Sequence, residues 1–219
     1  MEKRKALWIE RNLKQLLPRY FNQRAPQALL LYGREGIGKA ESAKAMSHAL
    51  LCLNSSANQP EPCELCQSCG WFLQGTHPDY TLLTGEEQIK VEQIRKLIEQ
   101  AHITSETGRK IVQIDRLERL NINAANALLK LLEEPPANLY FILSTNVMGR
   151  LPMTILSRCQ KVPAIVPSRE EGIRWLLDSG VAEQNIAEAL LSISYGAPFR
   201  ALQYYEADFK SEVAEIDQL

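Results

Sequence analysis

The sequence has few of the features that are typical of membrane proteins, secreted proteins or proteins that bind nucleic acid on their own. No apolar run approaches the roughly 20 residues of a membrane span, and the basic N-terminus lacks the apolar segment of a signal peptide. The net charge is -1 over 219 residues, which gives no electrostatic footprint for binding nucleic acid alone. We therefore expect a cytoplasmic protein whose five cysteines are thiols or metal ligands rather than disulfides.

The pattern of apolar residues predicts two domains. The apolar share of 45% and the charged share of 23% are those of a soluble globular protein. Strands that alternate with helices favour an α/β fold with a parallel sheet in residues 1–166. A small all-helical domain is expected over residues 167–219. The predicted strands cover 28–32, 80–83, 110–114 and 140–144, and the main predicted helices cover 41–53, 91–102, 123–132, 169–180, 182–194 and 199–209.

A phosphate-binding loop pattern follows the first predicted strand directly. The spacing G-x-x-x-x-G-K runs from Gly33 through Gly36 and Gly38 to Lys39. Glycines allow positive φ, so successive backbone N–H groups can form an anion cradle in which Lys39 contacts the β- and γ-phosphates. The next residue is normally a Ser or Thr that holds Mg²⁺, but here it is Ala40. A glycine-rich turn that binds no ligand is the alternative.

The strand over residues 110–114 ends in Asp115 and has the form of a Walker B segment. A hydrolysing protein of this class usually has a Glu next, which polarises the attacking water, but this chain has Arg116. Glu118 lies three residues after Asp115 and could in principle stand in for that Glu, but a surface role is expected. Since Mg²⁺ ligation and water activation each lower the barrier by several kcal/mol, we predict nucleotide binding without useful hydrolysis. Whether the loop holds ATP, ADP or another anion stays open.

Four cysteines have the spacing of a structural zinc site. They form the pattern C-x10-C-x2-C-x2-C, with the last three in a predicted loop: Cys52, Cys63, Cys66 and Cys69. Four thiolates suit tetrahedral Zn²⁺, and a closed site has no position for a catalytic water. The alternative is a group of buried or reactive thiols. We place a zinc module at about residues 52–70, expect Cys159 to be a core thiol, and expect His77 to be a hydrogen-bonding turn residue.

Several longer segments strongly resemble the bacterial clamp-loader subunits of the AAA+ class. They are NAANALLKLLEEPP at 123–136, FILSTN at 141–146, LSRC at 156–159 and GTHPDY at 75–80. Among these subunits, the departures at Ala40 and Arg116 are similar to the delta-prime type, whereas the ATP-hydrolysing gamma/tau type keeps both groups. The resemblance covers about residues 5–210. Members also have a helical collar domain, so we expect this chain to be a fragment with the first two domains.

The resemblance implies roles for three further residues. Arg158 matches the arginine that reaches into a neighbouring subunit's ATP site, where it spreads the charge of the transition state. Thr145 matches the sensor-1 position, and Arg200 matches the sensor-2 arginine that clamps the nucleotide. The alternatives are an Arg158 paired structurally with a nearby carboxylate, a vestigial Thr145 and a solvated Arg200 at the start of a helix.

The implied function is that of a stator in a DNA polymerase III clamp loader. Such a subunit binds structural Zn²⁺, can hold ATP or ADP without hydrolysing it, and works with delta and gamma/tau subunits. The assembled complex opens a sliding clamp and places it on primed DNA during replication. The first alternative is a gamma/tau-type ATPase motor. The second is a zinc-dependent nucleic-acid-binding module, which the near-neutral charge disfavours.

Overall fold

The chain folds into two compact units. The computed structural model describes residues 6–22 and 25–216, with side chains described up to residue 207. A sheet unit contains residues 13–33 and 40–163, and a helical unit contains residues 6–12, 34–39 and 164–216. The last segment of the helical unit begins at residue 164. The segments 6–12 and 34–39 were predicted to belong to the sheet domain, but in the structure they belong to the helical unit.

The sheet unit contains five parallel strands in the order β2-β3-β4-β1-β5, so the predicted parallel α/β architecture is confirmed. Four strands lie within one residue of their predicted ends. The fifth was not predicted, because four residues of mixed polarity carry no strand pattern. The strands are β1 (Ala28–Tyr32), β2 (Tyr80–Thr84), β3 (Lys110–Asp115), β4 (Leu139–Thr145) and β5 (Gln160–Pro163).

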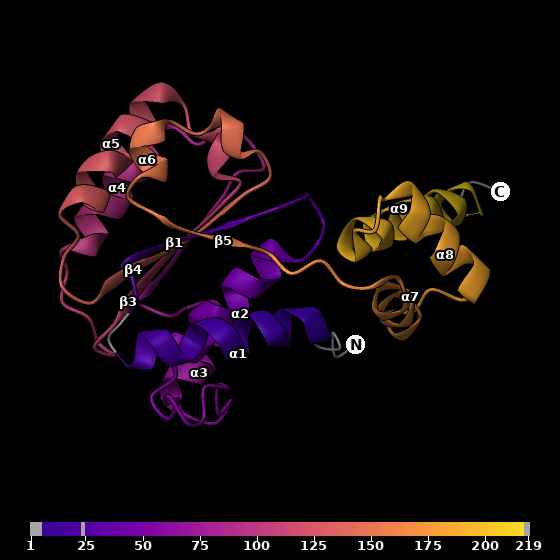
Figure 1. Ribbon diagram of the computed structural model, residues 1–219, viewed down its shortest axis with the longest axis horizontal. Helices are drawn as coiled ribbons and strands as arrows, with labels where there is room; N and C mark the ends of the chain where they lie inside the picture. The colour runs from indigo at the N-terminus through magenta and orange to yellow at the C-terminus, as the bar shows by residue number, and fades with distance from the viewer. Residues whose placement is uncertain (1–5, 23–24, 217–219) are drawn as a thin grey trace. The chain divides into compact units, whose positions relative to one another are not determined.

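Helices cover both faces of this sheet, with α4, α5 and α6 on one side and α1, α2 and α3 on the other (Figure 1). Alternate residues of β1 serve the two cores: Leu30 packs into the first, and Leu29 and Leu31 pack into the second. The helices are α1 (Leu7–Phe21), α2 (Lys39–Leu51), α3 (Gln67–Leu73), α4 (Val91–Ala101), α5 (Ile122–Glu133) and α6 (Met153–Leu156), with 3-10 turns η1 (Leu117–Arg119) and η2 (Met148–Arg150).

The helical unit contains α7 (Arg169–Asp178), α8 (Gln184–Ile193) and α9 (Pro198–Ile216), as predicted from the change of pattern near residue 167. Its aromatic core joins Trp8, Trp175 and Phe199, whose ring centroids lie 4.4 to 6.1 Å apart. An ion pair of 2.8 Å between Arg11 and Glu171 ties the start of the chain to α7. Within the described residues, no helix has the length and apolar character of a membrane-spanning segment.

Candidate functional site

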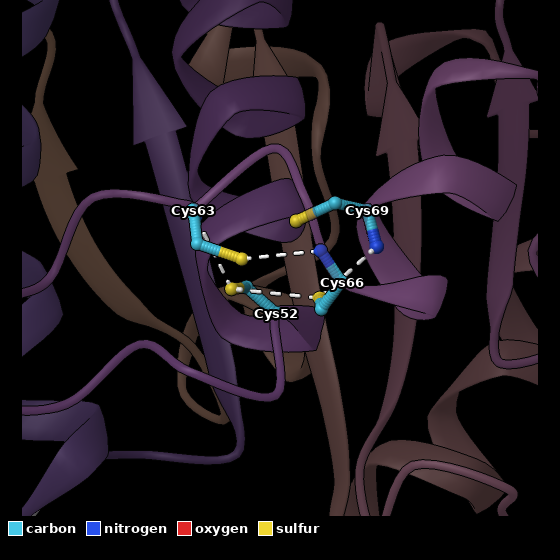
Figure 2. Close-up of side chains that lie close together, drawn as sticks. All are labelled: Cys52, Cys63, Cys66 and Cys69. Carbon is cyan, nitrogen blue, oxygen red and sulfur yellow. Dashed lines mark hydrogen bonds between the residues drawn. The ribbon is translucent and has the colours of Figure 1, made fainter.

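The four predicted metal ligands converge in the sheet unit (Figure 2). Their sulfur atoms all lie within 4.8 Å of one another, and the Sγ atoms of Cys52 and Cys66 are 3.9 Å apart. Four Zn–S bonds of about 2.3 Å in a tetrahedron place the sulfur atoms about 3.8 Å apart. The cysteines form no disulfide. The donor set and its spacing therefore fit a closed tetrahedral metal site.

Local structure explains how the cysteines come together. Cys52 directly follows the last residue of α2, and Cys66 is the N-cap of α3, where its sulfur accepts a hydrogen bond from the Cys69 backbone N–H at 3.4 Å. The sequence placed Cys66 and Cys69 in a loop, but they begin a short helix. Residues i and i+3 lie on the same side of a helix. The C-x2-C spacing of Cys66 and Cys69 therefore places both sulfur atoms on one side of α3. The ring of Phe72 stacks on His48 of α2 at 4.6 Å and anchors this helix.

Backbone N–H groups point at the sulfur atoms and favour thiolates. The Cys63 N–H donates to the Cys52 sulfur and the Cys66 N–H donates to the Cys63 sulfur, both at 3.3 Å. Hydrogen bonds from the backbone of Leu65 and Cys66 lower the pKa of the Cys63 thiol to about 6. Burial, together with the neighbouring thiols, instead raises the pKa of Cys69. A divalent cation would supply the charge that allows all four groups to ionise together.

Several carbonyl groups of the phosphate loop accept hydrogen bonds from other residues of the chain. Within the helical unit, the carbonyl of Arg34 accepts from Lys39 Nζ at 2.6 Å, and the carbonyl of Gly36 accepts from the Phe199 N–H at 2.9 Å. The carbonyl of Ile37 accepts from Trp8 Nε1 at 2.8 Å. In a trans peptide the N–H points opposite to the C=O. The N–H groups that follow the Gly36 and Ile37 carbonyls are therefore turned away from Phe199 and Trp8.

The loop glycines are needed for conformation and for space. Gly33, Gly36 and Gly38 all have positive φ. A Cβ on Gly36 would lie 2.4 Å from the Cβ of Arg200, and one on Gly38 would lie 2.7 Å from the ring of Phe199. The start of α9 therefore packs directly on the loop within the helical unit.

Replacing Gly36 with alanine is expected to destabilise the helical unit by about 1–3 kcal/mol, because the new methyl group meets Arg200 at a backbone angle of +78°. Urea unfolding followed by tryptophan fluorescence measures the loss. Gly149→Ala is the matched control, since nothing lies within 4 Å of its added Cβ. Equal stability of the two variants would contradict the close packing.

The Walker B carboxylate is held by two neighbours that the sequence analysis missed. Asp115 accepts a hydrogen bond at 2.9 Å from Gln113 Nε2 and another at 3.0 Å from Ser144 Oγ. Gln113 also donates to the Ala40 carbonyl at 3.3 Å and accepts from the Tyr80 hydroxyl at 2.7 Å. The amide therefore links the carboxylate to the residue that replaces the usual magnesium ligand. A polar residue inside an apolar strand was the signal that could have identified Gln113.

The hydroxyl of Thr145 is buried and donates to Glu118 at 2.7 Å. The N–H of Asn146 donates to the same carboxylate at 3.2 Å. The expectation that Glu118 lies on the surface is therefore wrong, because it is half-buried and bonded to the end of β4. Arg116 has a left-handed backbone with φ of 54°, and the 3-10 turn η1 that follows it carries Glu118 back toward β4.

Arg158 forms an ion pair with Glu133 at the end of α5, with Nη2 and Oε1 2.5 Å apart. Its Nη1 donates to the Thr154 carbonyl at 2.8 Å. The arrangement matches the alternative in which a nearby carboxylate pairs with this arginine. The side chains of Arg158 and Glu133 are 33% and 50% exposed, and pairs of this kind contribute about 0–1 kcal/mol. A stronger anion can therefore take the guanidinium from Glu133 at small cost.

Arg200 lies in the first turn of α9, is partly buried, and contacts Tyr204. Its Nε donates to the Tyr204 hydroxyl at 2.6 Å, and its guanidinium carbon lies 5.5 Å from the centre of the same ring. The structure thus brings Gly36, Gly38, Lys39 and Arg200 together in the helical unit.

The remaining predicted nucleotide residues belong to the sheet unit. Gly33 follows β1, Ala40 bonds to Gln113, and Asp115 and Thr145 end neighbouring strands. Cys159 lies in the core between strands and helices, where burial raises its pKa to about 11. It is a core thiol, as predicted.

Comparison with known proteins places this arrangement in a family. The profile of the family described as "DNA polymerase III, delta subunit" matches residues 9–165. A curated relative, DNA polymerase III subunit delta' of Pseudomonas aeruginosa, is 37% identical over 194 residues, which are 86% of this chain and 58% of the relative. DNA polymerase III subunit tau of Salmonella typhimurium is 34% identical over 165 residues, covering 75% of this chain and 25% of that protein.

The fold also matches a solved structure. A DNA polymerase III gamma subunit-related protein from Thermotoga maritima superposes with a TM-score of 0.57 at 22% identity, over 87% of this chain and 57% of that one. The sheet unit thus has the fold of AAA+ proteins. The chain spans 58% of the length of the Pseudomonas relative. Since the profile covers most of the chain, the chain belongs to the DNA polymerase III delta subunit family.

Proposed function

We propose that this chain is part of a delta-prime-type clamp-loader subunit, a catalytically impaired AAA+ frame. One observation carries the proposal: the phosphate loop is retained while the two groups that hydrolysis needs are replaced, by Ala40 and Arg116. The carboxylate of Asp115 supports it, because Gln113 and Ser144 already donate to its two oxygens. These two hydrogen bonds give the carboxylate a structural role within the sheet unit.

The chemical contribution of the subunit would be Arg158, acting on ATP bound by a gamma/tau partner. A guanidinium placed on a γ-phosphate spreads the charge of the transition state. The pair with Glu133 keeps Arg158 on the surface of the sheet unit in the separate chain, and its low cost of release supports a transfer to a partner's phosphate. The proposed partners are delta and gamma/tau subunits, the sliding clamp, and primed DNA through the assembled complex.

The proposed metal at the four cysteines is Zn²⁺ in a structural role. A tetrahedral set of four thiolates is typical of structural zinc sites, and it leaves no open position for a catalytic water. The proposed nucleotide is ATP or ADP held by the loop through Gly33, Gly36, Gly38 and Lys39. Thr145 and Arg200, which bond to Glu118 and Tyr204, would read or clamp it only after exchanging those partners.

Steady hydrolysis of Mg-ATP by the purified chain is expected to stay at background. Mg²⁺ ligation and water activation each supply several kcal/mol of barrier lowering, and both are missing. Phosphate release is measured with a gamma/tau subunit as the positive control and Lys39→Ala as the control for contaminating activity. Turnover that disappears in Lys39→Ala would favour the gamma/tau-type motor, which the similarity to a tau subunit keeps as the second candidate.

A further inference from the structure

We infer that His77 is a positioning residue of the cysteine metal site and that it acts through Ser68. His77 lies in the turn before β2, outside the cysteine pattern. Its Nε2 is 2.8 Å from Ser68 Oγ, and Ser68 lies between the ligands Cys66 and Cys69 on α3. The inference rests on the proposed metal site, because it assigns a role in holding that site's ligands.

The hydrogen bonds determine where the imidazole proton lies. The Asp79 backbone N–H donates to His77 Nδ1 at 3.0 Å, so Nδ1 is an acceptor and carries no proton. The neutral ring therefore carries its proton on Nε2 and donates it to Ser68 Oγ. The Ser68 hydroxyl in turn donates to the Leu51 carbonyl at 2.6 Å. Burial lowers the pKa of His77, which agrees with a neutral ring.

This ordered chain of hydrogen bonds connects three segments. It begins at the entrance to β2, passes through α3, and ends at Leu51, the last residue of α2. Leu51 directly precedes Cys52, and Ser68 lies between Cys66 and Cys69, so the chain holds the segments that carry three of the four ligands. Figure 2 shows the sulfur atoms of these cysteines close together. Groups behind metal ligands orient the donor atoms, and their loss typically lowers metal affinity about 10–100-fold.

Both side chains are well buried, so their contact is costly to lose. Ser68 is 0% exposed and His77 is 5% exposed. The ring of Trp71 meets the imidazole edge-on at 5.8 Å, which keeps water away from this side. Removing one partner leaves the other buried without its hydrogen bond. A simpler role for His77 would be to shape its own turn, through the bond from Asp79 alone.

Two variants separate these roles. Ser68→Ala removes the link to His77 and Leu51 with little change of volume. His77→Asn keeps the local turn, because an asparagine oxygen accepts from the N–H two residues on, but it cannot reach Ser68. Both should release Zn²⁺ to a coloured chelator about 10–100-fold faster than the original protein. The double variant should be no faster than Ser68→Ala alone, since that substitution already removes the Ser68–His77 contact.

Ser47→Ala is the matched control, because Ser47 is also 0% exposed in the sheet unit but lies outside the cysteine module. Acceleration in this control equal to that of Ser68→Ala would overturn the inference, as would release at the original rate from both test variants. A protein that binds no Zn²⁺ at all would overturn the proposed metal site itself. Long-range ¹H–¹⁵N spectra of the unaltered protein should show the Nε2-protonated tautomer of His77, and the Nδ1-protonated form would contradict the inference without any variant.

Discussion

Replacing Arg158 with alanine is expected to slow ATP hydrolysis at the partner site that it reaches by about 10³-fold or more. The effect is large because this guanidinium would neutralise charge that develops only in the transition state. The effect is measured by pre-steady-state phosphate release from the complex assembled with delta and gamma/tau subunits. If one of several ATP sites is slowed, the amplitude of the phosphate burst falls by the share of that site. Loading of the clamp onto primed DNA gives a second readout.

Three controls distinguish a trans-acting group from a structural one. Arg158→Lys keeps the charge but loses the planar fork, so it should restore little activity. Arg95→Ala removes an exposed guanidinium from α4 and should have no effect. Glu133→Gln breaks the ion pair while keeping Arg158, so it should retain hydrolysis. If Glu133→Gln slowed partner hydrolysis as much as Arg158→Ala does, the ion pair itself would be the functional unit and the trans role would be wrong.

Loss of one cysteine ligand is expected to abolish metal binding and the order of the cysteine module. Cys63→Ser should lower the bound Zn²⁺ from about one equivalent to none, measured by elemental analysis. Structural zinc contributes about 10–16 kcal/mol to the folding of small zinc peptides. The sheet has its own core, so residues 53–66 should lose protection in hydrogen exchange while β1 and β4 keep theirs.

Cys159→Ala provides the control for this experiment, because it also removes one thiol but from the core of the sheet unit. It should keep its zinc and lose only the stability expected for a small cavity. Full zinc content in Cys63→Ser, or unchanged hydrogen exchange after the metal has been removed, would contradict a structural metal site.

The strands and the phosphate loop could be predicted closely, because their signals are local. An apolar run at residues 28–32 followed by G-x-x-x-x-G-K leaves little freedom in what the chain forms. The short helix α3 and the strand β5 were missed, since seven and four residues hold too few apolar positions for a period to appear. The predicted surface position of Glu118 failed because its partner, Thr145, is 27 residues away.

The sequence alone determined which chemical groups are present and which are missing. The spacing of the four cysteines, the loop glycines, Ala40 and Arg116 can all be read directly, because spacing along the chain and side-chain type do not depend on the fold. Only the tertiary structure determined which partners the functional groups contact. Glu133 pairs with Arg158, Gln113 joins Ala40 to Asp115, and the start of α9 closes on Gly36. These contacts join residues up to 164 positions apart, and they exist only once strands and helices have packed in one order.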